Sequence, residues 1–488
     1  MPRPHRVILQ DRRSAPTALS AVSVLSLLSV LSACASYQPA PVDQSSLTAA
    51  YNARRLDDPG LHGYLASAGL DPATTGWQAR DLALAAWYWS PSLDRARAAR
   101  TEAIAGQITA GYRPQPGLSA AVEKDYSGGG GEPPWGVSGT LSFTFELGGK
   151  RGARMARAQA RTFLAEEEVS LVAWQEATDV RRSADRLASA EFRLGDVRAE
   201  LSALRTLDSV LKARYREGVV TRADLAQNEA ELQGALVERG LAQRELRDAV
   251  SGMAASVGVV PGQLDTLKVA PPGESWCTAA SALPRDSLQS LVVRSRPEVG
   301  VALAAYSVTE ADVRLQIANQ YPDITLGPGL FFDHGINKWT VLFALPTIPF
   351  HRNRGPIAEA EARRGVAAAQ VAVVQDSALA DLDTGLERCA VSSALRASAD
   401  SLFDLIRERA DRAQAAYDRG ETSRLELAFL DLARVRAERT RHAADQQRRE
   451  AGTLLEQAAG VWRSDPPARW PNPANEPRGT TLLKDTLP

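Results

Sequence analysis

Cys34 is the residue whose chemistry the surrounding sequence defines most clearly. An apolar stretch at residues 15–30 follows two arginines and ends at Leu31-Ser32-Ala33-Cys34. This stretch is shorter than the about 20 residues of a membrane-spanning helix and is typical of an export signal. Small residues before a cysteine suit cleavage by a signal peptidase and acylation of the new N-terminal thiol. We expect residues 1–33 to be a lipoprotein signal peptide and Cys34 to carry lipid, such as palmitate; the alternative is an ordinary signal peptide with a chance cysteine.

The rest of the composition argues against catalysis and against nucleic-acid binding. Lysine and arginine total 57 against 58 acidic residues, and no basic block stands out that would attract nucleic acid. The glycines at 128–131 lack the Lys-Ser/Thr that follows them in a phosphate-binding loop. The sequence has no readable catalytic triad, paired carboxylates or paired metal ligands. We expect no enzyme activity, no cofactor, no metal site and no nucleic-acid partner.

An internal duplication organises the chain. Tyr215-Arg216-Glu217-Gly218 recurs as Tyr417-Asp418-Arg419-Gly420, and Thr221-Arg222-Ala223-Asp224-Leu225 recurs at the same spacing as Ser423-Arg424-Leu425-Glu426-Leu427. Such matches define two repeats, at 78–260 and 284–462. Around the repeats we expect a lipid-anchored linker at 34–77, a connector at 261–283 and a Pro-rich tail at 463–488.

Each repeat contains a stretch of alternating polarity that predicts a β-hairpin. In the first repeat, Leu141, Phe143 and Phe145 alternate with serine and threonine, so one strand face is apolar and the other polar. The predicted hairpins cover about 116–147 and 322–346, with loops at 127–134 and 333–338.

Helical sequence fills the remainder of each repeat. Tracts at 152–217 and 356–419 are long enough for rods of about 100 Å at 1.5 Å per residue. Gly218 and Gly420 suit left-handed caps where the rods end, and Thr221 and Ser423 suit N-caps of the next helices. We therefore expect helical hairpins with tips at about 218–222 and 420–424. Apolar spacings predict coiled-coil seams at Leu204, Leu207, Leu211, Leu425, Phe429 and Leu432.

Two hairpins supply too few strands for a closed barrel. Membrane barrels need at least about eight strands, and open strand edges are not stable in lipid. If the hairpins cross a membrane, several copies of the chain must pool their strands. The alternative is a small soluble sheet on a helical body.

Together, the lipidated N-terminus, the duplication, one hairpin per repeat and the Tyr-x-x-Gly-x-x-(Ser/Thr) tips resemble the TolC family of outer membrane efflux proteins. Two segments are similar to its heavy-metal, CzcC-like branch: Glu146-Leu147-Gly148-Gly149-Lys150-Arg151 and Pro349-Phe350-His351-Arg352-Asn353-Arg354-Gly355-Pro356-Ile357-Ala358-Glu359-Ala360. The resemblance implies a mainly α fold with a β-barrel contribution, built from two repeats of helix, β-hairpin, long helix and helix. It also implies a homotrimer, with a 12-stranded outer membrane barrel over a periplasmic α-helical coiled-coil tunnel.

The same resemblance implies a function and partners. The chain would be the lipid-anchored outer membrane channel of a tripartite efflux system, with most of its residues in the periplasm. It would passively conduct heavy-metal cations or drugs delivered by a periplasmic adaptor, also called a membrane fusion protein, and an inner-membrane RND pump. The alternatives are the exit duct of a type I protein secretion system and a lipid-anchored coiled-coil scaffold without a pore.

Site residues also follow from the resemblance. Tyr417 and Glu426 match positions that close the periplasmic end of the tunnel, although Glu426 is equally suited to capping its own helix. The chain departs from the family pattern at Thr422 and Phe429, where an arginine and an aspartate are usual. Asp224, in the first repeat, is expected on the outer side of its tip. The expected adaptor-contacting tip residues are Gly218, Thr221, Arg222, Gly420, Ser423 and Arg424.

A disulfide is a further implication of the family fold. Cys277 lies in the connector, which wraps around the middle of the tunnel in this family, and Cys389 lies near the middle of a predicted rod. The two thiols would then meet in an oxidising compartment. The alternative is a pair of unpaired, buried thiols.

Overall fold

A computed structural model describes residues 37–72, 76–124, 126, 135–265, 269, 276–333, 335–344, 352–462 and 471–474. The chain divides into two compact units, Met1–Asn52 and Ala53–Pro488. The first unit contains α2 (Gln44–Asn52), whose residues are all exposed. The signal peptide and Cys34 lie outside the described residues, so their predicted roles remain predictions.

Two long helices form the backbone of the second unit. They are α7 (Lys150–Arg216) and α12 (Arg354–Asp418), of 67 and 65 residues. Both are rich in alanine, leucine, glutamate and arginine, which favour helix, and neither has proline beyond its first turn. The predicted tracts at 152–217 and 356–419 match these helices to within two residues at each end.

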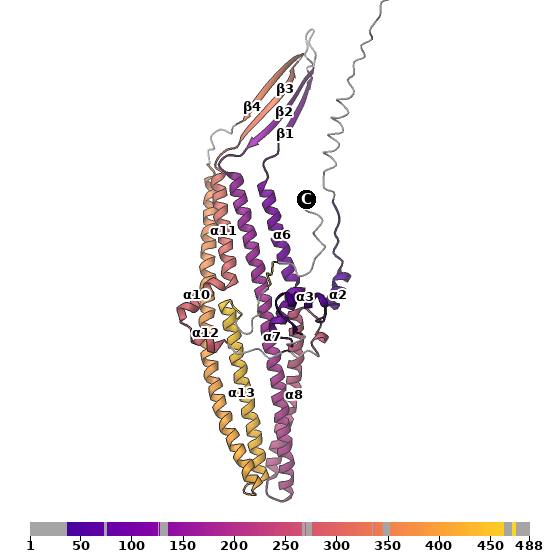
Figure 1. Cartoon of the computed structure of the whole chain (residues 1–488), viewed down its shortest axis with the longest axis vertical. Helices are drawn as coiled ribbons and strands as arrows, with labels where there is room; N and C mark the ends of the chain where they lie inside the picture. The colour runs from indigo at the N-terminus through magenta and orange to yellow at the C-terminus, as the bar shows by residue number, and fades with distance from the viewer. Residues whose placement is uncertain are drawn as a thin grey trace, which may run out of the picture. The chain divides into compact units, whose positions relative to one another are not determined.

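Shorter helices pack along each rod in the same order (Figure 1). In the first repeat, α6 (Pro91–Gly111) and α8 (Arg222–Val257) lie along successive parts of α7. In the second repeat, α11 (Pro297–Ala318) and α13 (Arg424–Ala459) lie along α12 in the same way. Helices α11 and α13 also contact α7, so the two repeats pack side by side. No helix in the described ranges has the length and apolar character to cross a membrane.

The main hydrophobic core surrounds the middle of α7. There, α3 (Pro59–Ser67) and α5 (Ala79–Trp89) bury leucine and tryptophan side chains against α7 and the end of α8. A break at Ser90 separates α5 from α6, and the Ser90 hydroxyl accepts a hydrogen bond from the Leu93 N–H over 2.9 Å. This N-cap lets the chain change direction at Pro91, where proline suits the first helical turn.

A second core fixes the connector against the other rod. Helices α9 (Cys277–Ser281) and α10 (Arg285–Ser295) bury apolar side chains against α12 and the end of α13. The buried members include Trp276, Leu288, Leu382 and Leu455. A short 3-10 helix, η1 (Pro261–Gln263), begins the connector after α8.

The hairpins of the two repeats join in one sheet. Its strands are β1 (Gly117–Lys124), β2 (Trp135–Phe145), β3 (Ile324–Asp333) and β4 (Ile336–Ala344), all antiparallel neighbours in chain order. The β2–β3 pairing connects the two repeats, and the alternating sequence of each hairpin does not by itself predict this pairing. The predicted loop at 333–338 is too long, because Asp333 pairs with Ile336 and the strands continue almost to the turn.

Candidate functional site

The strand register separates the sheet into an apolar and a polar face. Residues directly opposite on antiparallel strands share a face, and Leu326 pairs with both Phe143 and Phe343. On the same face, Trp339 is 77% exposed and Leu330 is 73% exposed. The opposite face is mainly polar. It carries the serine and threonine residues Ser138, Thr140, Ser142, Thr144, Thr325 and Thr340, together with three apolar residues, Phe331, Ile336 and Leu342. An exposed apolar face backed by a polar face is the pattern of strands between lipid and an aqueous lumen.

The sheet has two open edges within the described residues. Strands β1 and β4 each pair on one side only, because the strand order is β1-β2-β3-β4. An unpaired strand edge presents backbone N–H and C=O groups to any further strand. The outer edges of β1 and β4 are therefore suited to pairing with further strands.

The two helical-hairpin tips, at the far end of the rods from the sheet, have the same backbone geometry (Figure 1). Gly218 and Gly420 adopt left-handed conformations, with φ of 70° and 77°. At the first tip, the Val219 N–H donates to the Arg214 carbonyl oxygen over 2.9 Å. At the second tip, the Glu421 N–H makes the equivalent bond at 2.8 Å. These Schellman-type bonds end each rod at its glycine and turn the chain back into the next helix.

The acidic residues of the two tips use their side chains differently. At the first tip, the Thr221 N–H donates to Asp224 Oδ2 over 2.8 Å, which completes a capping box. Hydrogen bonds from the Thr221 hydroxyl and N–H lower the pKa of Asp224. At the second tip, Ser423 Oγ accepts from the Glu426 N–H, but the Glu426 carboxylate accepts from the Thr422 hydroxyl at 2.5 Å. Glu426 therefore occupies the third position of a capping box, but its carboxylate does not accept the reciprocal bond from the Ser423 N–H.

Tyr417 and Glu426 lie on the two helices that flank the second tip. Tyr417 is 36% exposed, and its carbonyl oxygen accepts a hydrogen bond from the Gly420 N–H over 2.9 Å. Glu426 is exposed in the first turn of α13. Between them, Arg419 and Glu421 form an ion pair at 2.8 Å. The expected adaptor-contacting residues Gly218, Thr221, Arg222, Gly420, Ser423 and Arg424 are all exposed.

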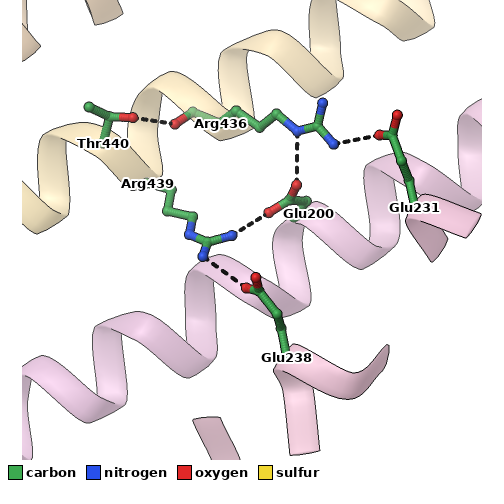
Figure 2. A network of polar contacts seen from close by, with 6 residues as sticks. All are labelled: Glu200, Glu231, Glu238, Arg436, Arg439 and Thr440. Carbon is green, nitrogen blue, oxygen red and sulfur yellow. Dashed lines mark hydrogen bonds and ion pairs between the residues drawn. The ribbon is translucent and has the colours of Figure 1, made fainter. Parts of the chain in front are cut away.

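An ion-pair network joins the two repeats on the sheet side of the tips (Figure 2). The sequence does not predict this network. Arg436 in α13 donates to Glu200 in α7 over 2.8 Å and to Glu231 in α8 over 2.7 Å. Arg439, one turn further along α13, donates to Glu200 and to Glu238 of α8, both over 2.8 Å. One carboxylate of the first repeat therefore accepts from two guanidinium groups of the second.

Burial and charge act in opposite directions on Glu200. The residue is 8% exposed, and burial by itself raises the pKa of a carboxyl. Hydrogen bonds from Arg436 and Arg439 outweigh that burial effect and lower the pKa of Glu200. The sequence indicates this network only weakly, because acidic residues on α7 and arginines on α13 are equally typical of solvent-exposed helix faces.

Apolar side chains also pack between the two repeats near this ion-pair network. Leu204, Leu207 and Leu211 of α7 are buried with Leu432 of α13, as the predicted seam requires. Phe429 differs from the prediction, because its side chain is 50% exposed. It borders a cavity between the helical hairpins and does not pack in the seam.

The structure joins Cys277 of α9 to Cys389 of α12 by a disulfide. Their Cα atoms are 5.2 Å apart, and the bond links positions 112 residues apart in the sequence. Both cysteines belong to the core that holds the connector. Among the residues that the structure describes, there is no group of three or more His, Cys, Asp or Glu side chains arranged to hold a metal ion.

Comparisons with known proteins identify the fold. No protein-family model and no curated protein matches the sequence. Among solved structures, the outer membrane protein VceC of Vibrio cholerae is 21% identical with a TM-score of 0.63, over 78% of this chain and 96% of that chain. The CmeC outer membrane channel of Campylobacter jejuni is 14% identical with a TM-score of 0.60, over 94% of each chain. CusC, described in connection with transmembrane channel formation, is 17% identical with a TM-score of 0.60, over 79% of this chain and 92% of that chain.

These similarities define the class of structure. The chain has the fold of the TolC-family outer membrane channels, mainly helical with a small β-sheet at one end of the helical rods. The expected order of helix, hairpin, long helix and helix in each repeat is confirmed.

Proposed function

We propose that this protein is the outer membrane channel of a tripartite efflux system. The observation that carries the proposal is the sheet, whose register places most of its large apolar side chains on one face and its serines and threonines on the other. A soluble protein gains nothing from exposing Trp339, Leu330 and Phe343 together, whereas lipid contact removes such side chains from water. This argues for the channel over the poreless scaffold.

A homotrimer is the assembly that we propose for the channel. Each copy contributes four strands with two open edges, which is fewer strands than the smallest membrane barrels contain. Pairing β4 of one copy with β1 of the next removes the edges, as lipid requires. Three copies would form a 12-stranded barrel in the outer membrane, with the long helices extending into the periplasm as a tunnel.

The helical tips are the proposed meeting point with the periplasmic adaptor and the inner-membrane RND pump. Each tip ends its rod at a glycine and presents exposed polar groups to solvent. In our proposal, Tyr417 and Glu426 narrow the channel at this end. Three symmetry copies of the Glu426 carboxylate would form a ring that attracts cations.

For the cargo, we propose passive conduction of heavy-metal cations or drugs that the pump delivers. The sequence similarity to the CzcC-like branch favours metal cations. Conduction needs no bound metal in the wall, because the pump supplies the driving force. Lipid on Cys34 would anchor the mature N-terminus to the outer membrane.

Two measurements on the full-length protein test the proposal. Light scattering in mild detergent should give the mass of a trimer, and insertion into a planar bilayer should give discrete conductance steps. A monomer, or a trimer that never conducts, would contradict the channel. Sensitivity of a deletion strain to metals and to drugs then distinguishes the cargoes, and cross-linking to an ABC transporter in place of an RND pump would favour the protein-secretion duct.

A further inference from the structure

A cavity of about 600 Å³ lies between the two helical hairpins near their tips. Helices α7, α8, α12 and α13 all contribute to its walls. The apolar part includes Leu207, Leu211, Leu402, Ile406 and Phe429. Its volume is within the range of about 300–1,000 Å³ found for pockets that bind small organic molecules.

Asn228 of α8 borders this cavity without hydrogen-bond partners. The residue is 4% exposed, and both its amide nitrogen and its amide oxygen lack a partner among the described residues. Buried amides are rarely left unpaired, because they lose their bonds to water and gain none in return. At the equivalent position of the second repeat the chain has Leu430, so packing in the hairpin does not by itself require an amide. Asn228 is therefore available to a ligand as both donor and acceptor.

The charged groups of the cavity favour a cation. Glu231 is paired with Arg436, which also binds Glu200, whereas Asp224 contributes a carboxylate that is hydrogen-bonded to Thr221 but forms no ion pair among the described residues. Phe429 adds an aromatic surface that is half exposed, and aromatic faces attract cations. The cavity thus combines an apolar wall, one unpaired amide and one carboxylate in excess over the cationic groups.

We propose that this cavity binds an amphipathic organic cation, whose apolar body packs against the leucines and whose hydrogen-bonding group pairs with Asn228. The site is formed by both repeats, so a bound molecule contacts each helical hairpin at once. Binding is a property of the folded chain and is measured whether or not the protein conducts.

Ethidium is a suitable probe, because it is a planar organic cation with amine donors and becomes brighter in apolar surroundings. We expect the full-length protein in detergent to bind ethidium saturably. Asn228→Leu should weaken the affinity roughly tenfold, as expected for loss of a buried hydrogen bond. The matched control is Gln233→Leu, which removes an exposed amide from the same helix outside the cavity and should leave the affinity unchanged.

Two further variants separate the contributions of space and charge. Ala433→Phe reduces the cavity while Asn228 remains, and it should abolish saturable binding. Asp224→Asn should weaken ethidium binding about threefold but leave binding of the neutral amine N-phenylnaphthylamine unchanged. Equal ethidium affinity in the wild type, Asn228→Leu and Ala433→Phe, each shown to be folded by circular dichroism, would overturn the proposal and indicate dye bound to micelles. A different result would overturn the preference for a cation. In that result the protein binds the neutral amine saturably, Asp224→Asn leaves this binding unchanged, and ethidium does not bind.

Discussion

Arg436 of α13 donates a hydrogen bond to Glu200 of α7 over 2.8 Å and so connects the second repeat to the first. The contact joins residues 236 positions apart in the sequence. Arg439 reaches the other oxygen of the same carboxylate, so removing Glu200 leaves two guanidinium groups with one partner each.

Glu200→Gln should reduce the free energy of unfolding by about 1–2 kcal/mol at pH 7. The expected change is modest because the side chains of Arg436 and Arg439 are 46% and 35% exposed, so solvent screens their charge. Denaturant unfolding of the detergent-solubilised protein measures the change. Glu102→Gln, which removes an exposed carboxylate on α6, is the control and should change the value by less than about 0.5 kcal/mol.

The same network makes stability depend on pH. Because the pKa of Glu200 is lowered in the folded protein, its contribution is complete above the pKa of the unfolded chain and is lost as pH falls through the folded value. The stability difference between the wild type and Glu200→Gln should therefore shrink steadily below about pH 4.5. A difference that stays constant down to pH 2 would show that charge on Glu200 does not matter.

The two faces of the sheet should tolerate charge differently. Val341 lies on the apolar face and its neighbour Thr340 on the polar face, and both are exposed in the single chain. Val341→Arg should disfavour membrane insertion by about 2–4 kcal/mol if the position lies near the middle of the bilayer. Thr340→Arg should insert normally and change only conductance. The folded fraction recovered in outer membranes measures both, and equal losses would contradict the assignment of the faces.

Lipidation of Cys34 should be visible by mass spectrometry. The N-terminal peptide of the mature wild-type protein should carry acyl chains. Cys34→Ser should still be exported but should lack this mass. Finding the unmodified cysteine in the wild-type envelope fraction would rule out the lipoprotein assignment.

Oxidation of Cys277 and Cys389 is tested by thiol labelling. Labelling of the denatured, non-reduced protein should modify neither cysteine, and prior reduction should expose both. Closing a loop of 112 residues is worth about 4–5 kcal/mol in the chain-entropy model. Reduction should therefore lower the midpoint of unfolding, and labelling of both thiols without reductant would exclude the bond.

Glu426→Gln tests the proposed gate. It should reduce the preference of single channels for cations, because three carboxylates would leave one narrow ring. The free energy of unfolding should change by less than about 1 kcal/mol. The Glu426 carboxylate accepts a hydrogen bond from the Thr422 hydroxyl at the tip, and the N-cap bond from the Glu426 N–H to Ser423 Oγ remains. Asp224→Asn neutralises the equivalent carboxylate of the first repeat and should leave selectivity unchanged. Equal effects of the two substitutions would show that the second tip does not line the pore.

Local sequence was sufficient for the elements that local physics controls. Left-handed backbone favours glycine, so Gly218 and Gly420 marked the ends of the rods. Strand side chains alternate between faces, so the sequence around Leu141 and Phe143 revealed an apolar and a polar face before any pairing was known. The duplication then predicted the same order of elements twice.

Contacts between the repeats could be decided only by the tertiary structure. Charged helix residues such as Glu200 and Arg436 have the sequence pattern of solvent-exposed positions. Only the packing of α13 on α7 brings these two side chains together. The exposure of Phe429 and the unpaired amide of Asn228 depend on the same packing. By itself, the sequence determined which segments are rods, turns and strands, because those preferences involve near neighbours. Only the tertiary structure decided which side chains meet, because such contacts depend on the relative position of helices far apart in the chain.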